Sequence, residues 1–390
     1  MFAGSGQRVA GSVSKMKELR IALLGQGFMG KAHSNAYCQA PHFFDLPYRL
    51  RRTLLCGRDA ASLASMAERW GWEETSTDWR AAIDRADIDV VDIALPNHLH
   101  GPAAIAAAEA GKIIFCEKPL ALSVDEARAM ERAARGVPTL VWFNYRRVPA
   151  IAYARQLIDE GRLGTIFHYS AAYKQQWGAD TSRAATWRMD PALAGSGVAD
   201  DLLTHSLDTA LYLNGPITET VARARTLAPN RAVDDAVMAL VMFENGSAGT
   251  FESTRFGIGC KNQNRFEIHG SGGMLRFNLE RLNHLEFVDA TNPSAEQGPR
   301  DLLVTDLKHP IFGNFWRPGH IIGYEHTFIA TLAEFLQSLS KGEAFHPNFT
   351  DALAVQQALD AVQRSAKTRQ WTAVEKEPVD TPVHNPVQRT

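Results

Sequence analysis

The sequence predicts an α/β protein with an N-terminal Rossmann doubly wound parallel sheet, followed by an α+β domain with a large, mainly antiparallel open sheet. In the first third of the chain, short apolar runs alternate with amphipathic or alanine-rich segments. From about residue 219, several strand-like runs follow one another with no helix between them. A glycine-rich turn directly follows the first apolar run. Strands that alternate with helices form parallel sheets through right-handed crossovers, whereas consecutive strands joined by tight turns form antiparallel ones.

The first domain is expected at residues 19–147. Its strands are predicted at 19–24, 53–56, 89–94, 113–116 and 139–142. Its helices are predicted near 29–40, 60–70, 78–86, 101–110 and 123–135. The last helix begins with Ser123-Val124-Asp125-Glu126, in which the Ser and Glu side chains can satisfy each other's free backbone amides.

The second domain is expected at residues 148–372, between a flexible leader at 1–18 and a polar tail at 373–390. Helices are predicted near 148–160, 200–213, 324–340 and 350–367. Strands are predicted near 219–227, 235–243, 247–255, 264–269 and 273–278. Glu244-Asn245-Gly246 and Gly270-Ser271-Gly272-Gly273 are typical of hairpin turns.

Composition excludes several classes of protein. The chain has 390 residues, 45% of them hydrophobic and 22% charged, as in globular proteins of two domains. A net charge of -2 gives no general attraction to nucleic acid or to an anionic membrane. No apolar run is long enough to span a bilayer or to act as a signal peptide, so we expect a cytoplasmic protein. The four cysteines are far apart and form no CxxC pair, so neither disulfides nor a cysteine metal site is expected.

The glycine-rich turn is Gly25-Gln26-Gly27-Phe28-Met29-Gly30. A GxGxxG motif alone is weak evidence, but here it follows a predicted strand and opens a predicted helix, which is the context that dinucleotide binding requires. The glycines allow a tight turn and a close approach of the backbone to a pyrophosphate, and the helix N-terminus offers free amides. The turn therefore predicts a nicotinamide dinucleotide as cofactor.

The end of the second strand bears on which nicotinamide cofactor binds. A carboxylate there would hydrogen-bond the 2′-hydroxyl of the adenosine ribose, whereas an arginine accommodates a 2′-phosphate. Gly57 occupies the position that we assign to the carboxylate, and Arg58 follows it. We therefore favour NADP, with NAD as the alternative because Asp59 could still turn back to the ribose.

Three further segments carry a resemblance to a known family. They are Pro96-Asn97-His98-Leu99-His100, Cys116-Glu117-Lys118-Pro119-Leu120, and the stretch from Gly195 to His205 that contains Asp201. With the glycine turn, they resemble the glucose-fructose oxidoreductase / inositol dehydrogenase / MocA (Gfo/Idh/MocA) family from about Leu19 to Lys367. The resemblance implies cofactor contacts at Pro96, Asn97, His98, Glu117 and Lys118, and it makes Lys118 the residue that reaches the substrate hydroxyl.

Asp201 and His205 are four residues apart on a predicted helix, so they share one face and can point into one cleft beside Lys118. We assign His205 as the base that takes the hydroxyl proton, Lys118 as the donor that stabilises the developing alkoxide, and Asp201 as the group that orients and balances charge. A lone Asp/His pair on a helix is more often structural, and the matching lysine segment reverses that balance. A metal site is not expected, because His98 and His100 point apart in an extended segment and no further ligand completes a set.

The predicted strand from Tyr169 to Trp177 places Tyr, Gln and Trp side chains on one face, which suits a sugar ring but also an ordinary aromatic sheet face. Within the family, Phe-Asn-Tyr-Arg-Arg at 143–147, Gln-x-Trp and Trp187-Arg188 are most similar to levoglucosan dehydrogenase-like sugar C3-dehydrogenases. That branch has a carboxylate where this chain has Gly57. The substrate contacts implied are Tyr145, Gln175, Trp177, Arg188, Asp201 and His205.

The expected reaction is reversible oxidation of a secondary hydroxyl of a sugar, anhydrosugar, glycoside or inositol to a ketone. Two alternatives exist on the same scaffold: a nicotinamide-dependent glycosidase that oxidises, eliminates and re-reduces, and a non-catalytic cofactor-binding sensor. The resemblance also implies a homo-oligomer, a dimer or tetramer, through the open face of the second sheet. The alternation of Met238, Leu240 and Met242 suits such burial, and an intramolecular core would explain it equally well.

Overall fold

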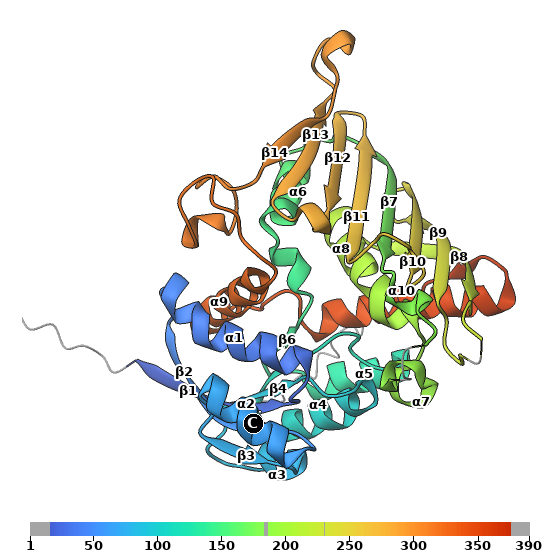
Figure 1. Cartoon of the computed structure of the whole chain (residues 1–390). Helices are drawn as coiled ribbons and strands as arrows, with labels where there is room; N and C mark the ends of the chain where they lie inside the picture. The colour runs from blue at the N-terminus through green and yellow to red at the C-terminus, as the bar shows by residue number, and fades with distance from the viewer. Residues whose placement is uncertain (1–15, 183–185, 230, 376–390) are drawn as a thin grey trace, which may run out of the picture.

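Two sheets organise the chain in its computed structural model, which describes residues 16–182, 186–229 and 231–375 (Figure 1). The first sheet lies in the lower part of the view, in blue and teal, and the second lies above it. The first is parallel and has six strands, and the second is mainly antiparallel and has nine; the sequence predicts the two arrangements but fewer strands in each.

The parallel sheet has the strand order β3-β2-β1-β4-β5-β6. Its strands are β1 (Lys17–Leu24), β2 (Tyr48–Cys56), β3 (Glu74–Ser76), β4 (Val90–Ile93), β5 (Ile113–Cys116) and β6 (Thr139–Val141). The order reverses between β1 and β4, and ligands of open parallel sheets bind outside the carboxyl ends of the strands at such a point.

Both faces of the parallel sheet are buried, and β1 shows how. Leu19, Ile21 and Leu23 pack into the core beneath α1 (Phe28–Phe43), α2 (Ala60–Trp70) and α9 (Glu325–Lys341). Ala22 and Leu24 pack into the opposite core with α3 (Trp79–Ile83), α4 (His100–Glu109) and α5 (Val124–Ala133). A strand buried on both faces has a continuous apolar run in its sequence, and in β1 this run extends from Ile21 to Leu24.

The second sheet has the order β14-β13-β12-β11-β7-β10-β9-β8-β15, and among its pairs only β7 and β10 run parallel. Its strands are β7 (Ile166–Lys174), β8 (Ile217–Arg225), β9 (Ala236–Phe243), β10 (Ala248–Thr254), β11 (Gln263–Gly270), β12 (Gly273–Asn278), β13 (His284–Asp289), β14 (Arg300–Leu303) and β15 (Thr372–Ala373). One face packs on α6 (Pro149–Asp159), α8 (Thr204–Asn214) and α10 (Phe349–Thr368). On the other face, Met238 and Leu240 of β9 are half exposed.

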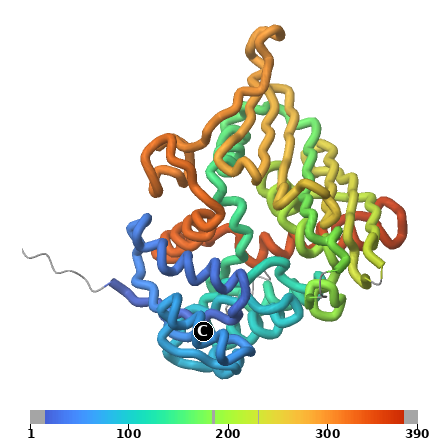
Figure 2. Tube along the Cα trace, in the orientation of Figure 1, coloured from blue at the N-terminus to red at the C-terminus, as the bar shows by residue number. Residues whose placement is uncertain are grey.

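The last two helices join the domains. α9 packs against α1 of the half that contains the parallel sheet, and α10 lies between α5 and β8 (Figure 2). In the described part of the chain, no helix is both long and apolar enough to cross a membrane.

Several elements differ from the sequence prediction. The short strand β3 and the three strands β13, β14 and β15 were not predicted, since they are short or rich in polar residues. β2 begins at Tyr48 rather than at residue 53. The sequence did not predict its first half because that half is basic and partly exposed. The helix predicted from residue 200 starts with a π-helical turn, Ala199–Leu203, before α8. The prediction of an extended segment at His98 and His100 was wrong: residues Asn97–Leu99 form a 3-10 turn that leads into α4.

Candidate active site

The glycine-rich turn joins β1 to α1 at the carboxyl edge of the parallel sheet. Gly25 has a φ of +130°, and a Cβ there would lie 2.2 Å from the carbonyl oxygen of Ala94, so only glycine fits. A Cβ on Gly30 would lie 2.1 Å from the carbonyl oxygen of Gly25, so α1 can pack this close only without a side chain. Gly27 faces open space, and α1 has neither a side-chain cap nor an acidic residue in its first turn. Its free amides and dipole suit the pyrophosphate of a dinucleotide.

The end of β2 lies beside this turn, and its polar groups are arranged around Gln26. The Gln26 side chain accepts from the amide of Asp59 at 3.3 Å and donates to Asp59 O at 3.3 Å and to Ser62 Oγ. It covers Gly57, where an added Cβ would lie 1.9 Å from Gln26 Oε1. The Asp59 carboxylate instead caps α2 by accepting from the Ser62 amide at 2.7 Å, and Arg58 is exposed.

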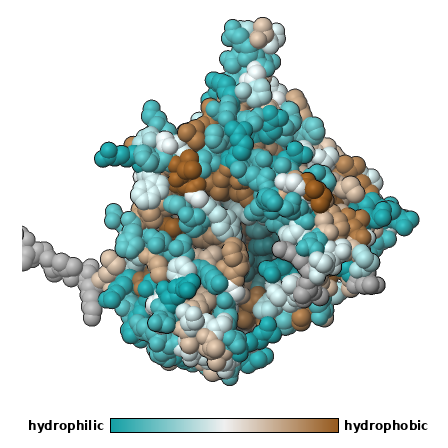
Figure 3. Space-filling view, viewed as in Figure 1, coloured by the Kyte–Doolittle hydropathy of each residue, from teal (hydrophilic) through white to brown (hydrophobic). Residues whose placement is uncertain are grey.

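A central cavity of about 1060 Å³ runs from this turn to the second sheet, and Figure 3 shows the hollow between the two halves of the molecule. Both domains contribute to its walls. Of the residues predicted from the sequence, it is lined by Gly25, Gly27, Phe28, Met29, Gly57, Arg58, Pro96, Asn97, His98, Glu117, Lys118, Tyr145, Gln175, Trp177, Arg188, Asp201 and His205. Gly30 is the one predicted site residue outside the lining, since it is buried beneath the turn.

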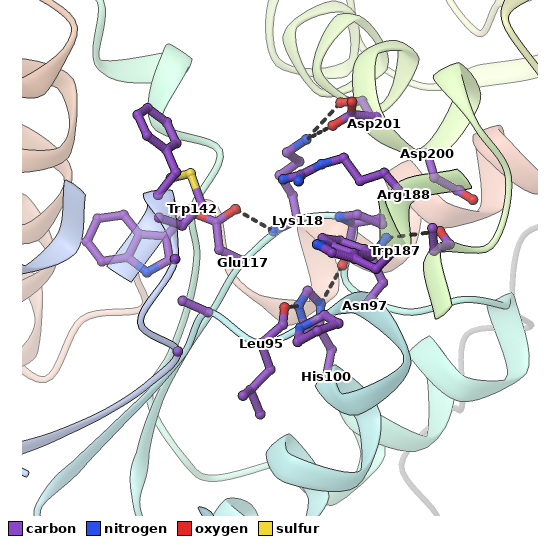
Figure 4. Close-up of a pocket in the computed structure, with 18 of the residues that line it drawn as sticks. Leu95, Asn97, His100, Glu117, Lys118, Trp142, Trp187, Arg188, Asp200 and Asp201 are labelled. Carbon is purple, nitrogen blue, oxygen red and sulfur yellow. Dashed lines mark hydrogen bonds and ion pairs between the residues drawn. The ribbon is translucent and has the colours of Figure 1, made fainter. Parts of the chain in front are cut away.

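Lys118 follows β5 and points across the cavity to Asp201 (Figure 4). Its Nζ donates to the main-chain oxygen of Asp201 at 2.7 Å and lies 3.4 Å from Oδ1 of the same residue. Arg255 donates from Nη2 to Oδ2 of Asp201 at 3.0 Å. Burial alone would raise the pKa of Asp201, but Lys118, Arg255 and Arg188 outweigh burial and hold that pKa well below its usual range. The carboxylate is therefore ionised and held between two cations.

His205 lies in the first turn of α8, with its ring 4.6 Å from the ring of Tyr145. The imidazole is buried, and burial together with the positive charge of Lys118 lowers its pKa well below 6.5, against the opposing effect of Asp201. The ring is therefore neutral at neutral pH. A neutral imidazole beside an ammonium group can accept a proton.

A chain of hydrogen bonds forms the wall opposite the glycine turn. Tyr145 OH lies 3.2 Å from Tyr173 OH, which donates to Asn262 Oδ1 at 2.7 Å. Gln175 donates to the same oxygen at 2.7 Å and accepts from Trp177 Nε1 at 2.6 Å. Because β7 ends at Lys174, Gln175 and Trp177 follow the strand rather than lying on it. The wall still combines aromatic surface with amide and hydroxyl groups, the mixture that a polyhydroxylated ring requires.

The loop before Asp201 is fixed by two other carboxylates. Asp234 accepts from the amides of Gly197 and Ala199 at 2.8 and 3.0 Å. Asp200, directly beside Asp201, turns away from Lys118 and accepts from the Ser196 amide and from Gln363. A Cβ on Gly197 would lie 1.9 Å from Asp234 O, so the loop can approach this strand end only with glycine. The loop and the π turn that follows it together bring Asp201 to Lys118.

The structure also adds residues that the sequence did not single out. Arg255 directly follows β10, is 1% exposed, and has its guanidinium 4.7 Å from the ring of Trp177. Asn262 lies in the loop before β11 and joins Tyr173 to Gln175. In the sequence, the only indication of a role for Arg255 is a basic residue at the end of a predicted strand. Nothing in the sequence around Asn262 indicates that it belongs to the site.

His98 and His100 do not form a metal site. His100 lies between two segments of the cavity floor, with Nδ1 2.9 Å from Pro119 O and Nε2 2.9 Å from Leu95 O, and the ring nitrogen that carries the hydrogen donates. Within the described ranges, no three histidine, cysteine, aspartate or glutamate side chains are grouped to hold a metal ion. All four cysteines lie in those ranges and are unpaired.

A Rossmann sheet with an open helix N-terminus, and a lysine, a carboxylate and a neutral histidine across the same cleft, define a nicotinamide-dependent dehydrogenase. Comparisons with known proteins agree. Residues 19–145 match the oxidoreductase family with an NAD-binding Rossmann fold, and residues 151–276 match the GFO/IDH/MocA C-terminal domain. The chain belongs to the Gfo/Idh/MocA family.

Similar proteins include sugar and inositol dehydrogenases. Levoglucosan dehydrogenase from Pseudarthrobacter phenanthrenivorans is 39% identical over 386 residues, which cover 92% of this chain and 99% of that protein. Inositol 2-dehydrogenase from Rhizobium meliloti is 27% identical over 366 residues, covering 91% and 99%. The solved structure of levoglucosan dehydrogenase in complex with NADH and levoglucosan has a TM-score of 0.90 and 40% identity, covering 92% of this chain and 100% of that one.

Proposed function

We propose that the chain oxidises a secondary hydroxyl of a sugar or anhydrosugar to a ketone, and that levoglucosan-like anhydrosugars are the first substrates to test. The observation that supports this most directly is the geometry at Lys118, which lines the cavity with its Nζ 2.7 Å from the main-chain oxygen and 3.4 Å from Oδ1 of Asp201. The hydrogen-bonded wall from Tyr145 to Trp177 supports a ring with several hydroxyl groups. The similarity to levoglucosan dehydrogenase supports the anhydrosugar.

Each of the three residues has a separate role in this proposal. The Lys118 ammonium donates to the substrate oxygen and stabilises negative charge as it develops there. Neutral His205 accepts the hydroxyl proton. Asp201 holds Lys118 in place and balances its charge. A bound nicotinamide supplies the acceptor for the hydride that leaves the carbinol carbon. The free amides of α1 and the open space over Gly27 would hold its pyrophosphate.

We further propose that the adenosine end of the cleft accepts the 2′-phosphate of NADP, with NAD as the alternative. Gly57 brings no carboxylate to this position, and the Asp59 carboxylate is used to cap α2. Arg58 is exposed and lines the cavity, so its guanidinium is available to a phosphate. Several structures of levoglucosan dehydrogenase are complexes with NADH, so the cofactor of this chain has to be tested directly.

The test is a panel of anhydrosugars, pyranoses, glycosides and inositols, each assayed with NAD and with NADP for net formation of reduced cofactor. We expect turnover with at least one anhydrosugar or pyranose, and a higher kcat/KM with NADP. Lys118→Ala should lower kcat by at least about a hundredfold, whereas Lys341→Ala, at the exposed end of α9, should not. Turnover of Lys118→Ala within a factor of about two of the wild type would show the site to be wrong. Release of an aglycone without net reduced cofactor would indicate a glycosidase instead.

The resemblance to the family also leads us to propose a homo-oligomer through the open face of the second sheet. Met238 and Leu240 support it, because both are half exposed there. Their neighbours Val237, Ala239 and Val241 are buried toward the helices. A cytoplasmic location stays a prediction from the sequence.

A further inference from the structure

Beneath the nicotinamide end of the cavity lies a buried network in which one histidine joins two carboxylates. His33 of α1 is fully buried. Its Nδ1 lies 3.0 Å from Asp92 Oδ2 on β4, and its Nε2 lies 3.0 Å from Glu117 Oε1 directly after β5. The ring also stacks on Trp142 with 4.3 Å between the ring centroids. Three separate elements of the Rossmann sheet therefore meet at this one side chain.

The charge of His33 follows from these contacts. A neutral imidazole has one N–H and can donate to one carboxylate, whereas an imidazolium donates to both. Burial lowers the pKa of the ring, but Coulomb attraction to Asp92 and Glu117 and the hydrogen bonds to both outweigh burial and raise the pKa to about 9. His33 is therefore an imidazolium at neutral pH, and it donates to both carboxylates.

Asp92 and Glu117 differ in how many hydrogen-bond donors they have besides His33. Asp92 also accepts from Tyr37 OH at 2.7 Å and from Trp142 Nε1 at 3.0 Å. Glu117 has one other donor, the amide of Lys118 at 3.1 Å. Glu117 lines the cavity, and Figure 4 shows its side chain directed away from the Lys118 side chain, toward Trp142. The charge and the direction of Glu117 thus depend mainly on His33.

We propose that His33 is a positioning residue that keeps Glu117 ionised and fixed at the floor of the nicotinamide site. This inference rests on the proposed function in one respect: the nicotinamide ring must bind at this end of the cavity. An oxidised nicotinamide carries a positive charge and a reduced one does not. A fixed carboxylate therefore favours the oxidised form, and His33 sets how much more tightly that form binds.

Replacement of His33 by an uncharged side chain leaves two buried carboxylates with no cation between them. Burial without a neighbouring cation disfavours the ionised form of a carboxylate, the more so the fewer hydrogen-bond donors it has. Asp92 keeps two donors and Glu117 keeps one, so Glu117 loses more of the support for its charge and its position. The oxidised cofactor then has a weaker or displaced counter-charge, while the reduced cofactor is little affected.

Several other titratable groups face Glu117 and have to be considered in a pH study. They are Asp92 from β4, Cys116 and Lys118 on its own segment, His100 from α4, Tyr145 from the turn before α6, and Tyr324 from the residue before α9. Burial raises the pKa values of Cys116, Tyr145 and Tyr324, so these three groups stay uncharged near neutral pH, and burial lowers the pKa of His100.

The test compares binding of oxidised and reduced cofactor to the full chain by titration calorimetry, with no sugar present. In His33→Gln we expect the Kd of the oxidised form to rise about tenfold and that of the reduced form to change by less than about threefold. Glu117→Gln should give the same change in the ratio, and the double variant should add nothing.

Tyr37→Phe is the matched control, because it removes a hydrogen bond to Asp92 without touching Glu117. We expect it to leave the ratio of the two affinities unchanged. The inference would be overturned if the ratio of the oxidised-form Kd to the reduced-form Kd were unchanged in His33→Gln or in Glu117→Gln. It would also be overturned if both affinities fell equally, in proportion to a loss of folding stability. If His33→Gln does not fold, Glu117→Gln decides alone. No binding of either cofactor form by the wild-type chain would overturn the proposed function and this inference together.

Discussion

At the scale of single residues, the roles of the site side chains follow from the charges that surround them. His205 is the clearest case. Its pKa is lowered well below 6.5 by burial and by Lys118, so it is deprotonated throughout the neutral range. A base that is already neutral needs no further rise in pH to act.

We therefore predict that no acid limb due to His205 appears above pH 6.5 in the pH profile of kcat/KM. His205→Asn should lower kcat by about a hundredfold to ten thousandfold, with little effect on cofactor Kd, since in the proposed reaction His205 acts on the substrate hydroxyl. Steady-state kinetics across the pH range measure both effects. A limb centred above 6.5 that disappears in His205→Asn would contradict the environment described for this ring.

His33 gives a second residue-scale prediction, this time for stability. Its pKa in the folded chain is about 9, against 6.5 for an unperturbed histidine. Protonated His33 therefore contributes its full stabilisation of the fold below pH 6.5, and this contribution is lost as the pH rises through about 9. The ring is fully buried, so the contribution is about 3 kcal/mol. Chemical denaturation at several pH values should show the free energy of unfolding falling more steeply from about pH 7 to about pH 9 in the wild type than in His33→Gln. If the free energy of unfolding changed with pH in the same way in the wild type and in His33→Gln, a charged His33 between Asp92 and Glu117 would be contradicted.

At the scale of elements, the sequence predicted those helices and strands that a local pattern of apolar residues determines. The apolar runs at Ile21–Leu24 of β1 and throughout β5 are continuous because both faces of the sheet are buried, and they were recognised for that reason, as was β4, whose run is broken only by the buried Asp92. β3 and β14 were missed because Glu74–Ser76 and Arg300–Leu303 carry almost no apolar pattern and pair only through the ladders beside them. Their strand character comes from a neighbour far along the chain.

The same distinction holds within the site. Lys118 and His205 stand in local motifs and were found. Arg255 reaches Asp201 only because β10 pairs with β7 and α8 packs on β7, and no pattern around residue 255 reports that contact. His33 was missed for the same reason, because its two carboxylates lie 59 and 84 residues away in sequence.

The junction of the glycine turn with the end of β2 supports an element-scale prediction. Gln26 fills the space over Gly57 and bonds Asp59 and Ser62, so a side chain at position 57 has to displace it. Gly57→Asp alone should lower kcat/KM for NADP by about tenfold through charge repulsion, with little gain for NAD. Gln26→Ala/Gly57→Asp should gain NAD activity, because the carboxylate can then reach the ribose. Gln26→Ala alone is the control. Equal NAD activity in the single Gly57→Asp and the double variant would show that Gln26 does not restrict this position.

At the scale of the whole molecule, the cleft depends on both domains and on the two C-terminal helices that join them. α9 packs on α1, whose N-terminus forms the glycine turn, and α10 packs on α8, which carries His205. Asp201 and His205, the second-domain residues that we propose to be catalytic, are therefore held against the glycine turn by contacts that lie outside the cavity. This arrangement leaves the outer face of the nine-stranded sheet without a covering helix in the described part of the chain.

That outer face supports the last prediction. Met238 and Leu240 are each 50% exposed, next to each other on one side of β9. Large apolar side chains in the middle of a sheet are expected to be covered, and a second copy of the chain can cover them. Met238→Glu/Leu240→Glu should therefore convert an oligomer to a monomer in size-exclusion chromatography with light scattering, because burying two carboxylates in an apolar interface is costly. Leu307→Glu/Ile321→Glu is the matched control, since both residues are exposed in the loop between β14 and α9. A wild-type chain that is monomeric at micromolar concentration, or a Met238/Leu240 variant that keeps the wild-type mass, would contradict an interface on this face.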